Sequence, residues 1–541
     1  WNALIGLWLL HGRKNGVVEA APFLAVAPLV PVRPCGRVAI LMTLRNEDPA
    51  RAFVRLRAVK TALDATACAD LFDFHLLSDT SEPAVAAAEE ALVARWREED
   101  GPARIFYRRR ASNAGFKAGN IRDFCETAGD GYQLMLPLDA DSLMGADTII
   151  RMVAIMQAHP EIGILQSLAV GLPAQSAFAR LFQFGMRHGM RCYTLGATWW
   201  AGDCGPYWGH NALIRVAPFR AAFHLPDLPG APPLGGPILS HDQVEAVLMR
   251  RAGYEVRGLP VEMESFEENP PAVTDFITRD LRWCLGNMQY LRLLDLPGLY
   301  PMSRFQLVWA IAMFLTVPAL PLLLVLLPFA ALEAQGAADF PTGLAMGLYG
   351  GLLFLSMAPK LAGLMDVALT RGGTARYGGP GRFWLSAGME LVFSFLLSAL
   401  TAMAVTVHLA RLAVGRVRTR WGAQARDGHA VSWRAAMRAF WGPTCFGFAV
   451  STGVLMVAPG LLIWLAPLLA GFVLAIPFAV VTADPRLGAA LVRGGLCATP
   501  EEFDPPDVVR AIGQLPIPAS PNRRGDGGLP CGDELARDEA G

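Results

Sequence analysis

The first part of the chain alternates short apolar runs with helix-like stretches. The apolar runs occupy residues 38–44, 72–79, 103–109 and 132–141. The stretch 82–96, which lies between two of these runs, has the pattern of a helix. Strands that alternate with helices predict a largely parallel sheet whose ligand-binding groups gather at the carboxyl ends of the strands. Asp79, Asp139 and Asp141 fall at such ends, so we expect an α/β domain with acidic residues at one edge of its sheet.

Four long apolar segments follow this α/β pattern. They occupy residues 305–331, 341–369, 383–412 and 443–482. A membrane-spanning helix needs about 20 residues, so the last segment has room for two spans that break at Ala458-Pro459-Gly460. The pattern therefore predicts at least five spans behind the α/β domain.

Charged residues in the connectors predict which side of the membrane each connector faces. The connector 333–340 carries two acids and no Lys or Arg, which predicts an outside location, whereas 371–382 carries three Arg and no acid, which predicts an inside location. Residues 411–440 hold seven Arg and one Asp, which also predicts an inside location. A single span through 383–412 would separate these two basic connectors. We therefore expect a hairpin of two short or tilted spans there, which brings the total to six; the alternative is a piece that lies along the interface.

These patterns divide the chain into five parts. Residues 1–12 resemble the end of a transmembrane helix cut by truncation, and 13–36 form a Pro-rich linker. Residues 37–300 hold the α/β domain with its interfacial helices, and 301–483 hold the membrane helices. Residues 484–541 are rich in Pro, Gly and acidic residues, which predicts a disordered tail.

The composition agrees with a soluble domain joined to a membrane region. Hydrophobic residues make up 53% of the 541 residues and charged residues 17%, which is too apolar for an ordinary soluble enzyme and too charged for a pure membrane bundle. The formal net charge of zero gives no indication of nucleic-acid binding. The nine cysteines are dispersed without a C-x-x-C pair, which argues against a zinc site and suits reduced thiols in a cytoplasmic domain.

Asp139-Ala140-Asp141 ends one of the apolar runs and is a candidate metal site. Hard carboxylate oxygens suit Mg²⁺ or Mn²⁺, and such an ion would neutralise a departing diphosphate. The motif is short enough to arise by chance, and a loop of solvated acids explains it equally well. The apolar residues before it favour the metal site, because they fix the acids at the edge of the sheet.

Ser240-His241-Asp242 precedes a helix-like stretch and carries a candidate catalytic base. The carboxylate of Asp242 is suited to take a proton from an acceptor hydroxyl in a transfer reaction. Taken alone, the position favours a simpler role, since Ser and Asp are both common N-cap residues of helices.

Arg279, Arg282 and Trp283 lie on one expected helix. Guanidinium groups bind phosphate oxygens through two parallel hydrogen bonds, and a Trp ring offers an apolar face to a sugar. The alternative is an amphipathic helix that lies on the membrane, because several Leu residues are nearby. The two interpretations are compatible.

Two polar clusters add further candidates. The glycine-containing loop 113–120 holds Lys117, and because this chain prefers Arg to Lys, a Lys here suggests a contact to phosphate; the alternative is a plain turn. We interpret the three Arg at 108–110 as a solvated face. Residues 207–211 group aromatic and polar side chains as sugar sites do, whereas His210 would otherwise be a core residue.

Two charges interrupt the apolar segments. Lys360 and Glu390 are costly in a membrane unless they are paired, reach the surface or face water. One hypothesis is that one of them lines a polar path for a glycan. Placement near a helix end is the simpler interpretation.

Together, these motifs resemble those of the processive inverting glycosyltransferases of family 2, the cellulose and hyaluronan synthase group. Within this family, the more specific resemblance is to enzymes that make the backbone of osmoregulated periplasmic glucans. It covers residues 1–485 and rests on IFYRRR, KAGNIRDFC, LDADSLM, YWGHNALIRV, ILSHDQVEAVLMRRAGY, RDLRWCLGN and the basic RWGAQARDGHAVSWRAAMRAF.

The resemblance implies a GT-A-like domain and a role for each motif. The nucleotide-sugar donor would be bound by Thr43, Glu47, Asp79, Lys117, Asn120, Asp139 and Arg282. Asp141 with Asp139 would hold the metal, and Asp242 would be the base in a Ser-His-Asp form of the family's Thr-Glu-Asp. The acceptor would be bound by Trp283, Trp208, His210, Asn211 and Arg279. Arg279 replaces the Gln of the family's Q-x-x-R-W, which leaves its role open.

The resemblance also implies an activity. The enzyme would transfer glucose from UDP-glucose to a growing β-1,2-glucan with inversion, using Mg²⁺ or Mn²⁺, at the cytoplasmic face of a bacterial inner membrane. The expected partners are UDP-glucose, the glucan, the lipid bilayer, acyl carrier protein and periplasmic glucan-processing proteins, and no nucleic acid. The alternatives are a synthase of another β-linked polysaccharide and a nucleotide-sugar-binding membrane transporter.

Overall fold

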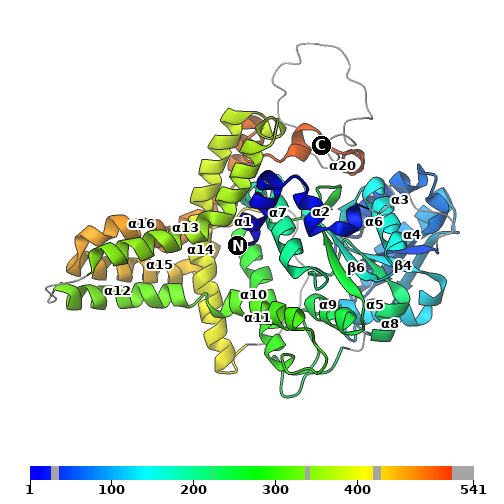
Figure 1. The fold of residues 1–541 in the computed structure, drawn as a ribbon, viewed down its shortest axis with the longest axis horizontal. Helices are drawn as coiled ribbons and strands as arrows, with labels where there is room; N and C mark the ends of the chain where they lie inside the picture. Colours follow the sequence, from blue (N-terminus) through cyan, green and yellow to red (C-terminus); the bar gives the residue numbers. More distant parts are fainter. Residues whose placement is uncertain (26–35, 223–224, 336–340, 418–427, 514–541) are drawn as a thin grey trace, which may run out of the picture.

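The chain folds into an α/β domain beside a set of long apolar helices (Figure 1). The structure is a computed structural model, and it describes residues 1–25, 36–222, 225–335, 341–417 and 428–513. The α/β domain fills one side of the molecule, and α12, α13, α15 and α16 extend away from it on the other side (Figure 1).

A seven-stranded sheet with the order β3-β2-β1-β4-β8-β6-β9 forms the centre of the α/β domain. Its strands are β1 (Val38–Leu44), β2 (Phe72–Ser78), β3 (Ile105–Arg109), β4 (Leu134–Asp139), β6 (Ile162–Ser167), β8 (Ala212–Arg215) and β9 (Glu255–Leu259). Only β8 runs antiparallel to its neighbours in this sheet. The largely parallel sheet predicted from the sequence is therefore confirmed, with the first four strands within two residues of the predicted runs.

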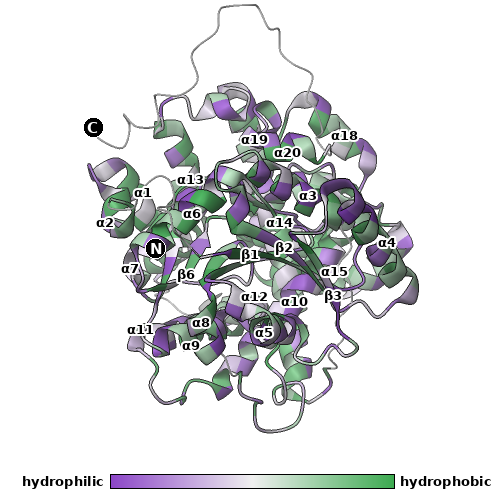
Figure 2. Cartoon of the chain, turned by 90° about the vertical axis from the view of Figure 1, so that its right-hand side faces the viewer, coloured by the Kyte–Doolittle hydropathy of each residue, from purple (hydrophilic) through white to green (hydrophobic). Residues whose placement is uncertain are grey.

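Helices cover both faces of this sheet (Figure 2). One face carries α3 (Pro49–Asp64), α4 (Pro83–Asp100) and α6 (Ala146–Ala158). The other face carries α5 (Phe116–Thr127), α8 (Val216–Ala222) and α9 (Asp242–Arg251). A smaller sheet at the carboxyl edge pairs β5 (Leu143–Met144), β10 (Ser265–Glu267) and β7 (Val170–Gly171).

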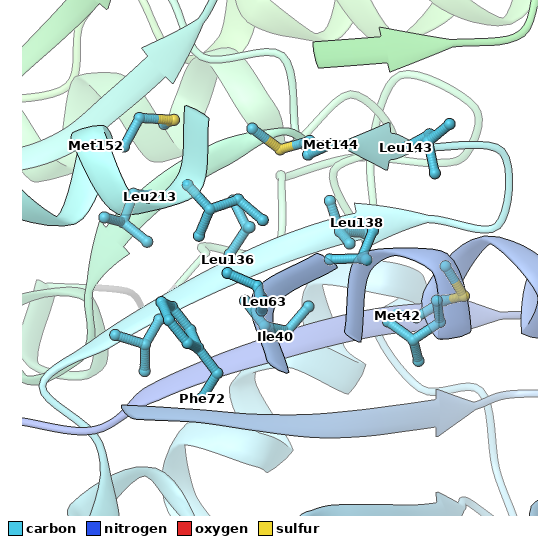
Figure 3. Packing of buried hydrophobic residues seen from close by; sticks show 14 of the residues in the cluster. Ile40, Met42, Leu63, Phe72, Leu136, Leu138, Leu143, Met144, Met152 and Leu213 are labelled. Atoms are coloured by element: carbon cyan, nitrogen blue, oxygen red, sulfur yellow. The ribbon is translucent and has the colours of Figure 1, made fainter. Parts of the chain in front are cut away.

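The strands are apolar throughout because both of their faces are buried. Val38, Ile40 and Met42 of β1 point into the core beneath α3 and α6, whereas Ala39 and Leu41 point into the core beneath α5 and α9. Figure 3 shows the first of these cores, where β1 packs with Leu63, Phe72, Leu136, Leu138, Met144 and Met152. Burial of each large apolar side chain contributes about 1.5–3 kcal/mol, so the sheet is a rigid support for the residues at its edge.

The N-terminal helix α1 (Asn2–Gly12) packs against the long helix α7 (Ala177–Ala201). A side chain at Gly6 would overlap the backbone carbonyl of Cys192, so the two helices approach closely. Part of the predicted linker is helical, with α2 (Gly16–Ala20) and a 3₁₀ turn at Pro22–Leu24. The remaining linker residues 26–35 lie outside the described residues.

The apolar segments form helices. These are α11 (Pro301–Leu315), α12 (Ala319–Gln335), α13 (Thr342–Leu369), α14 (Pro380–Ala413), α15 (Trp433–Val457), α16 (Leu462–Val473) and α17 (Ala475–Thr482). Three of them are long and apolar enough to cross a membrane, and the number rises to five if the pairs α11–α12, bent by 45°, and α16–α17, bent by 60°, each form one span.

The predicted hairpin within 383–412 is wrong. The structure has one continuous helix of 34 residues there, α14. A hairpin needs a turn, and this segment has no Pro and a single Gly, Gly388, so nothing in it ends the helix. Residues 336–340 and 418–427 of the two neighbouring connectors lie outside the described residues.

The two charges within the apolar helices pair with each other. Lys360 of α13 donates a hydrogen bond to Glu390 of α14, and Ser394 donates a second one at 2.7 Å. Both charges lie well inside their helices rather than at the helix ends. Pairing is therefore how these side chains are accommodated between apolar helices.

The predicted disorder of 484–541 is wrong for 484–513, and 514–541 lie outside the described residues. The segment forms α18 (Pro485–Gly494), α19 (Pro500–Phe503) and α20 (Asp507–Ala511). Glu502 accepts a 2.8 Å hydrogen bond from Arg180 of α7, and Glu501 accepts one of 2.9 Å from Arg187. The acidic composition suggested solvation, but these acids are buried against α7, more than 300 positions earlier in the chain.

Candidate active site

A cavity of about 280 Å³ opens at the carboxyl edge of the central sheet. It is bounded by the ends of β1, β2 and β4, by the starts of α5 and α9, and by α10 (Val273–Gln289). Twelve of the predicted site residues line it, namely Thr43, Glu47, Asp79, Lys117, Asp139, Asp141, Trp208, His210, Asp242, Arg279, Arg282 and Trp283.

A larger cavity of about 770 Å³ lies between α7, α18 and the loop after β10. It shares Glu268 with the smaller cavity. Its described lining residues include none of the predicted site residues and no aromatic side chain. The smaller cavity, which has both paired carboxylates and aromatic rings, is the better candidate for chemistry on a sugar.

Two adjacent strands bring Thr43, Asp139 and Asp141 together at the edge of the sheet. Thr43 lies opposite Asp139 in the register of β1 and β4, and its hydroxyl is 3.4 Å from an Asp139 carboxylate oxygen. Asp141 follows in the turn after β4. The rigid sheet therefore fixes the two carboxylates without help from a ligand.

Lys117 balances part of this negative charge. It lies in the first turn of α5, after Gly115, whose φ of 68° only Gly adopts readily. Its ammonium group donates a hydrogen bond to Asp139. Burial opposes the charged form, but Asp139 outweighs it and raises the pKa of Lys117. A charged ammonium group therefore borders the cavity beside Asp139.

The Asp139–Asp141 pair fits a divalent cation. Both carboxylates border the cavity and supply the hard oxygen donors that Mg²⁺ and Mn²⁺ prefer. A second group, His241, Asp242 and Glu245, also places three potential ligand atoms within 4.8 Å of one another. In that group the His241 Nδ1 and Glu245 Oε1 atoms are only 2.6 Å apart, which is a hydrogen-bond distance.

Asp242 is the first residue of α9, so the N-cap interpretation of Ser240 or Asp242 does not hold. His241 occupies the N-cap position and makes no side-chain cap hydrogen bond. Gly209 packs directly against the Asp242 carboxylate, because a Cβ there would lie 2.7 Å from the Asp242 Cγ atom. The Asp242 side chain is about one-third exposed, toward the cavity.

The helix α10 supplies the opposite wall. Arg279, Arg282 and Trp283 all border the cavity from this helix. The Arg279 guanidinium carbon lies 4.7 Å from the Trp283 ring centroid, so the Arg that replaces the family's Gln stacks on the Trp. The Trp283 ring is still 48% exposed.

The remaining aromatic and polar cluster is only partly at the cavity. Trp208 and His210 border it, whereas Asn120 and Asn211 do not. Asn120 donates to the backbone oxygen of Leu77 at 3.1 Å. Asn211 donates to Ser265 Oγ at 3.0 Å and to the Phe266 oxygen at 3.1 Å. Both amides are buried, and they hold strands and loops in place.

The chain is related in sequence to known glycosyltransferases. Residues 134–358 match the description Glycosyl transferase family group 2. The chain is 37% identical over 519 residues to glucans biosynthesis glucosyltransferase H of Xanthomonas campestris pv. campestris, covering 93% of this chain and 79% of that protein. It is 36% identical over 539 residues to the protein of the same name from Caulobacter vibrioides, covering 94% and 78%. The chain belongs to the glucans biosynthesis glucosyltransferase H family.

Membership in the glucosyltransferase H family makes the chain a glycosyltransferase of glucan biosynthesis. The predicted GT-A-like α/β domain joined to helices able to cross a membrane is confirmed. Among solved structures, the chain is similar to a mannosyltransferase from Pyrobaculum calidifontis in complex with GDP-Man and Mn²⁺. That match has a TM-score of 0.41 and 17% identity, and it covers 68% of this chain and 98% of the other.

Sequence reasoning about this glucosyltransferase H family member missed the role of Arg110. We interpreted residues 108–110 as a solvated face, which is wrong for Arg110. Its side chain is mostly buried and donates to both Asp79 oxygens, at 2.6 and 2.8 Å. Arg110 directly follows β3. This position at a strand end could have indicated that Arg110 lies near the acids at the same edge of the sheet.

Sequence reasoning also missed Glu267, which ends β10 and borders the cavity. Its carboxylate lies 3.3 Å from His210 Nε2. Burial opposes the charged imidazolium, but the hydrogen bond to Glu267 and the nearby Asp139 raise the pKa of His210 to about 9. His210 is therefore a charged wall residue of the cavity rather than a neutral core residue. Nothing in the sequence around the three-residue strand β10 marked Glu267.

Proposed function

We propose that the chain is a processive, inverting glucosyltransferase. It uses UDP-glucose to extend a linear β-1,2-glucan and passes the product across a bacterial inner membrane. The observation that carries the proposal is one cavity that gathers a carboxylate pair, a separate carboxylate and an Arg–Trp pair, beside helices able to cross a membrane. Membership in the glucosyltransferase H family supports glucan as the product.

The donor binds along the carboxyl edge of the sheet in this proposal. Thr43, Glu47 and Asp79 contact the uridine, and Arg110 keeps the Asp79 carboxylate in a fixed orientation. Lys117 and Arg282 provide positive charge for the diphosphate, and Arg282 suits two-point binding of phosphate oxygens. When bound at Asp139 and Asp141, Mg²⁺ or Mn²⁺ would neutralise the negative charge that builds up on the leaving UDP.

In the proposed transfer step, Asp242 acts as the base. The acceptor hydroxyl oxygen forms a bond to the anomeric carbon of glucose while the bond from that carbon to the diphosphate breaks, which inverts the configuration. The hydroxyl proton moves to the Asp242 carboxylate, and the bonding electrons leave with UDP. Trp283 stacks on the acceptor sugar across the cavity.

The location and partners of the enzyme complete the proposal. The catalytic domain faces the cytoplasm, where UDP-glucose is available, and the product leaves toward the periplasm. Acyl carrier protein and periplasmic glucan-processing proteins are proposed as further partners on the basis of the family resemblance. Helices long and apolar enough to cross a membrane support a location in the lipid bilayer.

The test compares three proteins in detergent with UDP-glucose and Mg²⁺. They are the parent, Asp242→Asn, and a control Asp130→Asn whose side chain is 83% exposed and outside the cavity. We expect the parent and the control to make β-1,2-glucan and Asp242→Asn to bind UDP without turnover. A polymer with another linkage would favour another β-glucan synthase. UDP-glucose binding without turnover by the parent would favour a transporter.

A further inference from the structure

A histidine and a buried glutamate lie directly behind the proposed base. His241 Nδ1 is 2.6 Å from Glu245 Oε1 and 3.1 Å from Asp242 Oδ1. The Glu245 side chain is fully buried, and that of His241 is 9% exposed. Glu245 lies one helical turn after His241, so α9 itself holds the two side chains together. The imidazole Nδ1 is thus hydrogen-bonded to Glu245 and lies within ion-pair distance of Asp242.

The surroundings favour a charged imidazole at this position. Burial opposes the charge, but Glu245 and Asp242 outweigh it and raise the pKa of His241 to about 9. The other titratable groups near the cluster include Lys117 and Cys125 of α5, Tyr207 before β8, and Tyr290 of the 3₁₀ turn after α10. The Tyr290 hydroxyl is engaged, because it donates to the Ser240 backbone oxygen at 2.9 Å.

A metal ion is a poor fit for the same three residues. Ligand atoms about 2.0–2.2 Å from a tetrahedral metal lie about 3.3 Å or more from each other. The separation between His241 Nδ1 and Glu245 Oε1 is 2.6 Å, which matches a charge-assisted hydrogen bond instead. The geometry therefore favours a proton between these atoms.

We propose that His241 and Glu245 are positioning residues for Asp242. Glu245 holds the His241 imidazolium, and the imidazolium, whose Nδ1 lies 3.1 Å from Asp242 Oδ1, fixes the orientation of the Asp242 carboxylate toward the cavity. The inference rests on the proposed function, because it assigns the pair to the base of that reaction. His241 borders the cavity beside Asp242, whereas Glu245 does not border it. Without the imidazolium, Asp242 would face the Glu245 carboxylate across a short gap, and the repulsion would favour protonation of one of them.

The proposal predicts a change in the pH dependence of turnover. A neutral side chain in His241→Gln removes the cation beside Asp242, so the acidic limb of the kcat profile moves to higher pH by about 1–3 pH units. Activity then recovers at alkaline pH, because the base itself is intact. Glu245→Gln leaves the imidazole in place but removes its anchor, and a smaller shift in the same direction is expected. His241→Lys restores a cation and shifts the limb back toward that of the parent.

The experiment measures kcat and KM for UDP-glucose between pH 5 and 10, on the full chain in detergent, together with UDP binding. His159→Gln is the matched control, because His159 pairs with Glu161 at 2.9 Å away from the cavity. A His241→Gln profile that superimposes on the parent's, or that is equally reduced at every pH with UDP binding intact, overturns the inference. If His241→Gln does not bind UDP, the Glu245→Gln profile decides by the same criterion. A parent that makes no polymer would refute the proposed function instead.

Discussion

A buried ion pair holds the C-terminal segment 484–513 to α7, and its removal should measurably lower the stability of the protein. Arg180 and Glu502 have side chains that are 0% and 1% exposed, and their closest atoms are 2.8 Å apart. Arg180 also donates to the backbone oxygens of Ala174 at 2.9 Å and Leu496 at 3.0 Å. The two terminal guanidinium nitrogens therefore have acceptors, and Glu502 supplies a neutralising charge at this contact.

We expect Glu502→Leu to lower the free energy of unfolding by about 3–5 kcal/mol, because it leaves the Arg180 charge buried without its counter-ion. Replacing both partners in Arg180→Met with Glu502→Leu should recover most of this loss, since a buried pair exchanged for apolar side chains of similar size is often neutral. The control is Asp507→Leu. Its pair with Arg510 is exposed, at 95% and 56%, and such pairs contribute about 0–1 kcal/mol.

The assay combines thermal unfolding in detergent with limited proteolysis of the segment 484–513. Glu502→Leu should unfold at a lower temperature and be cut within this segment, whereas the double variant and Asp507→Leu should resist cleavage. If Glu502→Leu is as resistant as the parent, the pair does not hold the segment. If the double variant is the less stable of the two, then direct attraction rather than charge burial controls the stability, and the reasoning fails.

Three further predictions test other parts of the molecule. Burial lowers the pKa of His75 to about 4 from 6.5. Neutral His75 therefore contributes about 3 kcal/mol to the free energy of unfolding above pH 6.5, and this contribution is lost as pH falls to 4. Acid unfolding curves of His75→Gln should lack this pH-dependent loss of stability. Gly209→Ala should displace the Asp242 carboxylate and lower kcat by about 100-fold while UDP binding persists. Lys360→Met should leave Glu390 buried without its cation and lower the unfolding temperature. The double variant Lys360→Met with Glu390→Gln should regain part of the lost unfolding temperature.

The sheet and its edge were predictable because they depend on short-range patterns. Runs such as 38–44 are apolar on both faces, which is characteristic of a parallel strand between two helical layers. Once the strands are placed, the acids at their carboxyl ends must meet. Asp79, Asp139 and Asp141, which the pattern placed at strand ends, therefore line one cavity.

The features that were missed depend on contacts between distant parts of the chain. Arg110 was taken as solvated because three consecutive Arg usually face water, yet its partner Asp79 ends the neighbouring strand. Glu501 and Glu502 belong to a segment whose composition suggests disorder, and their burial follows from their partners Arg187 and Arg180 on α7. Composition describes the average environment of a segment, whereas a buried ion pair is decided by one partner that the local sequence does not contain.

The helix α10 combines a face that borders the cavity with an apolar face that packs on the protein. Arg279, Arg282 and Trp283 are three and four residues apart, a spacing that places them on one face of the helix, toward the cavity. Cys284, Leu285 and Met288 are buried on the other side, and Asn287 donates to the Ala310 backbone oxygen of α11 at 3.1 Å. The apolar face thus packs on the protein's own helices. A single helix therefore forms a wall of the cavity and contacts the first apolar helix after the domain, so a shift of that apolar helix would act directly on the cavity wall.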